Sequence, residues 1–366
     1  MAPLTERDTR TLRRGAGGEP DIWIAFHLHY HEDPERVLLD VVRPAAAELL
    51  RQGAVDSFFF IRYVAGGPHV RLRLRVRPGR AASVAAVVED AARRLFACRP
   101  SRRRLDEAAL RRALGPAAAG GPSPPDALVL EPDNACLRAP FAPEVRRYGG
   151  ARYLPASLGL FALSSAVALG HAATLRAASR GRRLAVALEA LLGQALGYAA
   201  DGEELRRLLL YGLDAWGSLY PAAVRQGLGG DPRQRESLRA LWPRQLERRL
   251  ALDPDAPLAA AGEPIALASL RLSRMLGRRD VPRRARVGWS QLHMTANRLG
   301  LTAAEEVYLG ALWSAALAEC RQGWPEGWRR LERTLDDAHR RRLPAGSLEP
   351  GLPAVLAAVL GVVAAP

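Results

Sequence analysis

The sequence lacks lysine entirely, has only three cysteines, and contains no nucleotide-binding or serine-hydrolase motif. Cys98, Cys136 and Cys320 are isolated along the chain, so they provide neither a disulfide framework nor the paired spacing of a zinc site. Without a P-loop, a dinucleotide fingerprint or a Gly-x-Ser-x-Gly elbow, nucleotide-dependent chemistry and serine hydrolysis have no support. We therefore expect reduced thiols and a function outside these classes.

Because lysine is absent, all 53 basic residues are arginines, and with 38 acidic residues the formal net charge is +15. This charge either attracts an acidic peptide or a nucleic acid, or reflects a composition rich in arginine, alanine, glycine and proline. The polar N-terminus is unlike a signal peptide. The longest apolar run, Leu352–Ala365, is too short to span a bilayer and is expected to form a packed terminal helix. We expect a soluble, cytoplasmic protein without a membrane partner.

Strand and helix patterns alternate in the first part of the chain, and helical patterns follow. Period-two alternation predicts strands at residues 22–29, 57–63 and 69–76, the last two joined in an antiparallel hairpin. Helical spacing predicts helices at residues 33–50 and 80–96, a loop or linker near 115–125, and strand and turn character within 128–148. Further helices are expected at residues 157–178, 182–198, 202–211, 234–252, 265–276, 287–299, 302–322 and 328–342.

The expected fold class is therefore α+β. A mixed or antiparallel N-terminal sheet with helices is followed by a predominantly helical region packed against it. In chain order we expect a disordered segment over residues 1–20, the sheet-containing region over 21–155 and the helical region over 156–366. The last two regions are expected to form one continuous unit.

The segment His69–Val76 places three arginines on one face of the third predicted strand. Side chains alternate faces along a strand, so Arg71, Arg73 and Arg75 lie on one side with His69, and the apolar residues lie on the other. Each guanidinium can form two hydrogen bonds with a carboxylate, so the segment can serve as an anion-binding wall. Alternatively, it is an exposed edge strand whose charges prevent aggregation.

Two later segments combine polar side chains at short spacing. Glu144 lies three residues before Arg147, with a glycine pair following, and forms either a polar site or a surface salt bridge. His293 and Asn297 lie one turn apart if their segment is helical. The histidine is then either a general acid or base, or a structural residue.

Three histidines, His27, His29 and His31, share one face of the first predicted strand and suggest a metal site. No carboxylate or cysteine partner lies at ligand spacing from them. The sequence therefore predicts no bound metal.

In this order the motifs resemble those of the lantibiotic dehydratase C-terminal domain, which also occurs alone as the thiopeptide-type bacteriocin biosynthesis family. The resemblance rests on Phe58–Tyr63 with Gly67–Arg73, on Pro143–Gly150, and on His293–Gly300 with Glu305-Glu306. It spans roughly residues 20–320, and the motifs are specific only in combination. The family's usual Asp-Pro turn before the histidine strand is replaced here by Ala65-Gly66-Gly67-Pro68, which leaves the subfamily open.

The resemblance implies that the chain eliminates glutamate from glutamylated serine or threonine in a ribosomally synthesised precursor peptide, leaving dehydroalanine or dehydrobutyrine. In full-length dehydratases another domain attaches the glutamate from glutamyl-tRNA. This chain is too short to include that domain, so the implied partners are a separate glutamylation protein and the leader and core of the precursor peptide. A homodimer is also compatible with the sequence. No cofactor is implied, because arginines can neutralise the departing glutamate and the developing enolate.

Carried over position by position, the resemblance assigns roles to four residues. Arg73 and Arg147 bind the glutamyl group and stabilise the enolate. Glu144 and His293 transfer protons, with Glu144 alternatively orienting Arg147, and which of the two is the base stays open. The residues implied to contact the substrate around them are Arg62, His69, Arg71, Tyr148, Asn297 and Arg298.

Two other functions are compatible with the sequence. The same fold serves as the pyridine synthase of thiopeptide assembly, which joins two dehydroalanines by a formal (4+2) cycloaddition and releases the leader peptide. The other alternative is a non-catalytic subunit that presents the peptide to a partner. Glu144, Arg147 and His293 together favour elimination. No specific nucleic-acid partner is expected, because aromatic residues do not interleave with the arginines.

Overall fold

The computed structural model describes residues 22–119, 129–229, 232–253, 255–256, 258, 263–323, 325–340 and 351–362. Contacts between residues group the chain into two compact units. Unit 1 comprises Met1–Val145, Phe161–Ala177 and Gly351–Pro366, and unit 2 comprises Arg146–Leu160 and Ala178–Pro350. The disordered segment predicted at residues 1–20 lies outside the described residues, and the division predicted near residue 155 stays a prediction.

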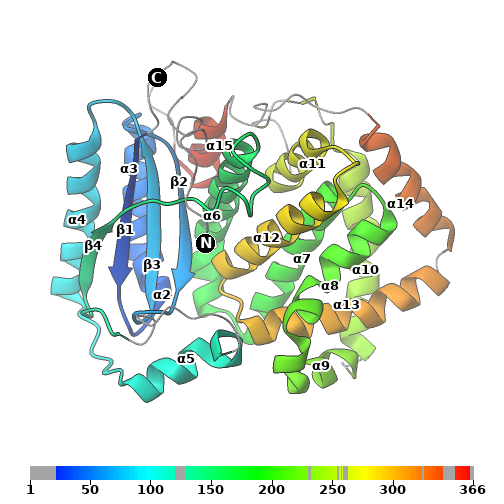
Figure 1. Ribbon diagram of the computed structural model, residues 1–366, viewed down its shortest axis with the longest axis horizontal. Helices are drawn as coiled ribbons and strands as arrows, with labels where there is room; N and C mark the ends of the chain where they lie inside the picture. The colour runs from blue at the N-terminus through cyan, green and yellow to red at the C-terminus, as the bar shows by residue number, and fades with distance from the viewer. Residues whose placement is uncertain are drawn as a thin grey trace. The chain divides into compact units, whose positions relative to one another are not determined.

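Unit 1 is built on a four-stranded antiparallel sheet in the order β2-β3-β1-β4 (Figure 1). The strands are β1 (Ile22–His29), β2 (Val55–Tyr63), β3 (His69–Val76) and β4 (Ala135–Ala139). A helical segment joins β1 to β2, and α4 (Ala81–Cys98) and α5 (Glu107–Ala119) come between β3 and β4 in the chain. This is a split βαβ arrangement, with β3 between β1 and β2. The α+β class expected from the sequence is confirmed.

The helical segment after β1 begins at a side-chain cap. The Asp33 carboxylate accepts a hydrogen bond from the Glu35 amide, and Pro34 occupies the first turn, where no amide donor is needed. A π-helical turn stands directly before Pro44, whose nitrogen cannot donate to the preceding turn. Gly53, with a φ of +60°, follows the end of the segment, as predicted. The parts are α2 (Pro34–Val37), the π turn Leu38–Val42 and α3 (Arg43–Arg51).

The sheet has one apolar and one polar face, because side chains alternate along each strand. On the apolar face Phe26, Phe58 and Leu72 are fully buried. The helices cover this face, since α2 contacts β3, α3 contacts β2 and α4 contacts β1 and β4. The opposite face carries the histidines and arginines of β1 and β3.

Two more helices belong to unit 1. The Phe161–Ala177 part of α6 (Leu154–Ala177) lies in this unit, where the Ser165 hydroxyl accepts a hydrogen bond of 3.1 Å from the Phe60 amide. The predicted terminal helix is confirmed as α15 (Leu352–Val359), which contacts α3 and β2. Among the described helices, α6 alone is long and apolar enough to cross a membrane, and 72% of its most apolar stretch is buried. Such burial is typical of a core helix.

Unit 2 is helical. The predicted helices after residue 155 are confirmed, with shifted ends, whereas α9 was not predicted. The helix α5 of unit 1 was also not predicted. It extends to Ala119, so its last residues occupy the start of the loop that was expected near residues 115–125. The helices of unit 2 are α7 (Arg180–Tyr198), α8 (Gly202–Trp216), α9 (Pro221–Leu228), α10 (Pro232–Leu250), α11 (Pro264–Leu276), α12 (Val281–Arg298), α13 (Ala303–Gly323) and α14 (Pro325–Ala338).

Glycine allows two helices of unit 2 to pack at very short range. A Cβ atom at Gly212 on α8 would lie 2.7 Å from the carbonyl oxygen of Glu306 on α13. Any side chain there would force the helices apart, because contacts this short do not occur between a Cβ and a backbone atom. Glycine at this position therefore keeps Glu306 against α8, next to Tyr211.

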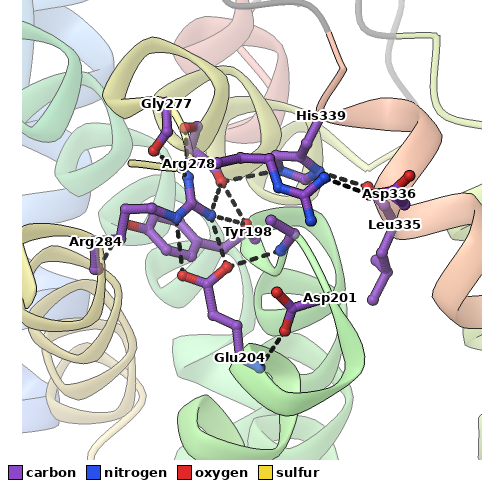
Figure 2. Close-up of polar contacts among 11 residues, drawn as sticks. Tyr198, Asp201, Glu204, Gly277, Arg278, Arg284, Leu335, Asp336 and His339 are labelled. Atoms are coloured by element: carbon purple, nitrogen blue, oxygen red, sulfur yellow. Dashed lines mark hydrogen bonds and ion pairs between the residues drawn. The ribbon is translucent and has the colours of Figure 1, made fainter. Parts of the chain in front are cut away.

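A buried ion pair joins several helices of unit 2 (Figure 2). Arg284 on α12 donates to both carboxylate oxygens of Glu204 on α8, at 3.0 and 2.7 Å. Its guanidinium also donates to the carbonyl oxygen and the hydroxyl of Ser273 on α11, each at 2.7 Å. His339, directly after α14, bonds the same hydroxyl through Nε2 at 2.9 Å. The cluster thus ties the ends of α8, α11 and α14 to α12.

Candidate functional site

The strand β3 carries a row of basic side chains on the polar face of unit 1. Arg71, Arg73 and Arg75 are partly exposed and alternate with four buried apolar residues, as predicted. However, β3 pairs with β2 on one side and with β1 on the other, so it is an interior strand. The alternative of an exposed edge strand is therefore wrong. An interior row of arginines is better suited to bind an anion.

Aromatic rings surround the guanidinium groups of this row. The Arg71 guanidinium carbon lies 3.4 Å from the centre of the Tyr63 ring. That of Arg73 lies 5.6 Å from both Phe59 and Phe141. Burial, followed by the charge of Arg71, lowers the pKa of Arg73 to about 10. Arg73 therefore keeps its positive charge at neutral pH, in surroundings where an anionic partner interacts strongly.

Three imidazoles lie beside these arginines. His27 and His29 project from β1, and His69 is the direct cross-strand partner of His29. The rings of His29 and His69 stack with centres 4.3 Å apart, and those of His27 and His69 lie 5.1 Å apart. Burial lowers the pKa of His27 and His29 to about 4 and that of His69 to about 3, so all three are neutral at pH 7. The polar face thus combines permanent cations with neutral rings.

The loop before β3 depends on a glycine. Gly67 has a φ of +99°, which favours glycine, and a Cβ there would lie 2.5 Å from Nε2 of His31. The Gly67 carbonyl oxygen accepts a hydrogen bond of 2.7 Å from Nδ1 of His69. His31 itself is held by Asp133, whose carboxylate accepts from the His31 amide at 2.9 Å. The departure from the family's Asp-Pro turn therefore makes room for His31 and still orients His69.

Arg62, predicted to contact the substrate, lies on the other face of the sheet. It is the cross-strand partner of Val70 and forms an ion pair with Glu35 of α2, with nitrogen–oxygen distances of 2.8 and 2.9 Å. This geometry is that of a bidentate structural pair between strand and helix. A role for Arg62 in substrate binding stays a prediction.

The free energy of unfolding should fall as the pH drops from about 7.5 to about 5.5, because buried histidines stay neutral in the folded chain. Burial lowers the pKa of His69 and of His339 to about 3, from an ordinary 6.5. Below 6.5 the unfolded chain binds protons that the folded chain does not. Each such histidine then removes up to about 1.4 kcal/mol per pH unit. Urea denaturation at several pH values measures this slope.

The ordinary pKa values of carboxyl groups lie below this pH window. The replacement His339→Gln should reduce it, whereas His171→Gln, at an exposed position on α6, should leave it unchanged. A free energy of unfolding that stays constant through the window would contradict the prediction.

The segment 146–150 forms a tight turn at the start of unit 2. Arg147 donates from Nε to the Ser290 hydroxyl of α12 at 3.0 Å, and Tyr148 is buried. Gly149 and Gly150 have φ values of +91° and +98°, which explains the glycine pair. Glu144 is exposed and is assigned to unit 1, directly before the boundary between the units.

A histidine–carboxylate pair lies on the same face of α12, one turn after Ser290. Nδ1 of His293 lies 3.1 Å from an oxygen of Glu306, which also accepts a hydrogen bond of 2.7 Å from the Tyr211 hydroxyl. The Glu306 side chain is 2% exposed and that of His293 is 26% exposed. An ionised Glu306 therefore draws the imidazole proton to Nδ1 and leaves Nε2 as a proton acceptor. This arrangement suits general base catalysis.

The end of α12 holds the last two predicted contact residues. Asn297 lies one turn after His293 on the same partly exposed face, as predicted. Arg298 is completely buried. Its contact with a substrate stays a prediction, because a completely buried side chain packs against its own protein.

Each unit thus gathers part of the predicted site. His69, Arg71 and Arg73 lie together in unit 1, and Arg147 and His293 contact or adjoin Ser290 in unit 2. Sequence reasoning assigned no role to Glu306, Tyr211 and Ser290. Glu306 stood within a quoted motif, but its pairing with His293 depends on how α12 packs against α13, which spacing alone does not show.

The family model for the C-terminal part of lantibiotic biosynthesis dehydratases matches residues 23–317. The chain belongs to the lantibiotic dehydratase C-terminal family. Members of this family act as enzymes in lanthipeptide and thiopeptide biosynthesis, on precursor peptides and with partner biosynthetic proteins. The resemblance found in the sequence is confirmed.

Several solved structures are similar to this chain. The tRNA dependent lantibiotic dehydratase MibB from Microbispora sp. 107891 is 22% identical with a TM-score of 0.49, over 85% of this chain and 29% of that one. The pyridine synthase TbtD from thiomuracin biosynthesis is 22% identical with a TM-score of 0.51, over 81% of this chain and 97% of that one. TsrL is 18% identical with a TM-score of 0.47, over 86% and 99%. This chain therefore spans less than a third of the length of MibB. No curated protein sequence matches it.

Proposed function

We propose that this member of the family eliminates glutamate from glutamylated serine or threonine residues of a precursor peptide. The observation that carries the proposal is the pairing of His293 with the buried carboxylate of Glu306. Elimination requires a base for the proton on Cα, and a partly exposed imidazole oriented by a carboxylate meets this requirement. Neither a cofactor nor a metal is needed for this chemistry.

The reaction moves one proton, breaks the Cα–H and Cβ–oxygen bonds and forms one carbon–carbon double bond. Nε2 of His293 takes the proton from Cα, the electron pair forms the Cα–Cβ double bond, and the Cβ–oxygen bond breaks to release glutamate. The product is dehydroalanine from serine or dehydrobutyrine from threonine. Tyr211 and Glu306 stabilise the imidazolium that forms. Glu144, exposed before the turn, returns a proton or orients Arg147.

Arginines neutralise the negative charge that develops. Arg73, with Arg71 beside it, binds the departing glutamate carboxylate, and Arg147 stabilises the enolate on the peptide. Arg71 and Arg73 are desolvated, since burial is the main cause that lowers the pKa of each. A desolvated guanidinium pairs more strongly with a carboxylate than an exposed one.

The proposed elimination depends on partner molecules. A separate glutamylation protein, as the family resemblance implies, would supply the substrate from glutamyl-tRNA. The precursor peptide would be recognised through its leader and core. Since glutamyl-tRNA is cytoplasmic, the protein would act in the cytoplasm, as a monomer or a homodimer.

The test is mass spectrometry of a glutamylated, azole-containing precursor peptide incubated with the purified protein. Loss of glutamate with formation of a dehydroamino acid supports the proposal. Survival of the glutamylated peptide, together with pyridine formation and leader loss from an already dehydrated peptide, would replace it with the cycloaddition. No change in either peptide, with binding retained, would indicate a peptide-presenting subunit.

Replacing Arg73 with glutamine should lower kcat/KM for elimination by about 30-fold or more, since loss of a desolvated charged partner costs 2 kcal/mol or more. The matched control is Arg77→Gln, just after the same strand, where the side chain is 55% exposed and pairs with Asp56. This control should change kcat/KM little. Equal losses in both variants would contradict the assigned role of Arg73.

A further inference from the structure

The strands β1 and β3 bring three histidines together that are far apart in the sequence. His27 and His29 share a face of β1, and the sheet register places His69 opposite His29. One ring nitrogen from each can be chosen so that all three lie within 4.8 Å of one another. We propose that His27, His29 and His69 form a binding site for a transition-metal ion of the zinc class.

To bind one ion, the three nitrogens, which now lie within 4.8 Å of one another, must move closer together. Nitrogens bound to one tetrahedral Zn²⁺ at 2.0–2.1 Å lie about 3.3 Å apart. All three donors come from paired strands, whose backbone positions are set by the ladder of hydrogen bonds between β1 and β3. Three imidazoles leave one coordination position of a tetrahedral ion open.

His29 supplies an independent argument for a ligand. Its side chain is 1% exposed, and within the described part of the chain neither ring nitrogen has a hydrogen-bond partner. A buried polar group without a partner costs about 1–3 kcal/mol, so such groups are rare without an ion or water. A metal ion bound to His29 would compensate this cost.

His69 is already oriented as a metal ligand. Its Nδ1 donates to the Gly67 carbonyl oxygen at 2.7 Å, which places the proton on that nitrogen and leaves the lone pair on Nε2. Backbone carbonyls commonly orient ligating histidines in this way. At present Nε2 accepts a hydrogen bond of 3.0 Å from Nε of Arg71. Arg71 and a metal ion therefore compete for the same lone pair.

The donor set selects the class of metal. Neutral imidazoles suit zinc, nickel and copper, whereas magnesium and calcium require oxygen ligands. The charges of Arg71 and Arg73 oppose a cation, and an anionic fourth ligand such as hydroxide or a carboxylate would offset them. The site would thus hold a metal together with an anion.

The sequence suggested a different trio, and this explains why no metal was predicted. His31 follows β1, but its ring lies 3.9 Å from the Asp133 carboxylate and packs against Gly67. His69 is the third histidine of the cluster in place of His31, because the register between β1 and β3 places it opposite His29. That register depends on residues forty positions apart in the chain and is not visible as a spacing motif.

The test is titration of the untagged full-length protein with Co²⁺, followed by displacement with Zn²⁺. We expect one equivalent of Co²⁺ with the visible absorption of a four- or five-coordinate ion. The variants His29→Ala and His27→Ala should each weaken Co²⁺ binding by at least about 100-fold. Loss of a residue that only hydrogen-bonds to a metal ligand costs up to about this factor, so loss of a ligand should cost at least as much. His31→Ala and the exposed His171→Ala serve as matched controls with unchanged affinity.

The variant Arg71→Met distinguishes a metal site from a purely structural histidine cluster, because only a metal site predicts a gain in Co²⁺ affinity. Removing the competing donor and its charge should raise the affinity for Co²⁺ about tenfold or more, while the elimination proposed above becomes slower. The metal site does not depend on that elimination, so the two can fail separately. Absence of a stoichiometric site, or equal affinity in the wild type and in His27→Ala, would overturn the proposal.

Discussion

Replacing His293 with alanine should lower kcat for glutamate elimination by about 10²–10⁴-fold, the range expected for loss of a general base. The imidazole is the group that accepts the Cα proton, so its removal leaves the bound peptide without an acceptor. Glu306→Gln should also lower kcat with little change in KM, because an amide can donate to Nδ1 and so move the imidazole proton to Nε2. Single-turnover mass spectrometry with a glutamylated peptide measures both rates.

The neighbouring Glu305 offers a matched control. It accepts hydrogen bonds from Thr302 at the start of α13 and pairs with Arg180, so Glu305→Gln should leave kcat nearly unchanged. If Glu306→Gln raised KM and left kcat intact, Glu306 would be a binding residue and not a positioning residue for the base. If His293→Ala retained full activity, Glu144 would become the base.

Replacing Arg284 with methionine should lower the free energy of unfolding of unit 2 by about 3–5 kcal/mol, the usual cost of removing one partner of a buried ion pair. The side chains of Arg284 and Glu204 are 3% and 15% exposed, so the carboxylate would lose its partner where water compensates poorly. Urea denaturation followed by tryptophan fluorescence measures the change, since six of the seven tryptophans belong to unit 2.

Arg278 provides the control for this stability effect. Its ion pair with Asp336 is 43% exposed on both sides, and Arg278→Met should cost less than about 1 kcal/mol. Changing Glu204 to methionine together with Arg284 should recover part of the loss, because no charge is then left buried. Equal destabilisation by Arg278→Met and Arg284→Met would show that burial of the pair does not matter.

The strands and most helices could be predicted from the sequence because their periods are visible locally. β1 and β3 match their predicted limits. Apolar residues alternate with arginines in β3, whereas in β1 the alternation with histidines is confined to the second half of the strand. β4 has five partly buried or exposed residues at the sheet edge, and it appeared in the sequence only as general strand and turn character. α9 has eight residues and one buried position, too little for a periodic signal.

Only those features of the site that lie within a single strand or helix could be predicted from the sequence. Alternation placed Arg71 and Arg73 on one face, and helical spacing placed His293 and Asn297 on another. The pairing of His293 with Glu306 requires α12 to pack against α13, and the meeting of His29 with His69 requires a sheet register. Both contacts depend on tertiary packing, which leaves no spacing pattern in a single sequence.

The interior position of β3 has a consequence for folding itself. Its two neighbours, β1 and β2, must each pair in the one register that keeps Leu72 in the core. A slip of one residue in β3 would turn Arg71 and Arg73 into the helix-covered face and move the apolar side chains to the opposite face. Such a misfolded sheet would bury unpaired charges at a cost of several kcal/mol. The arginines of β3, which give the polar face its chemistry, therefore also disfavour a shifted register of the strand.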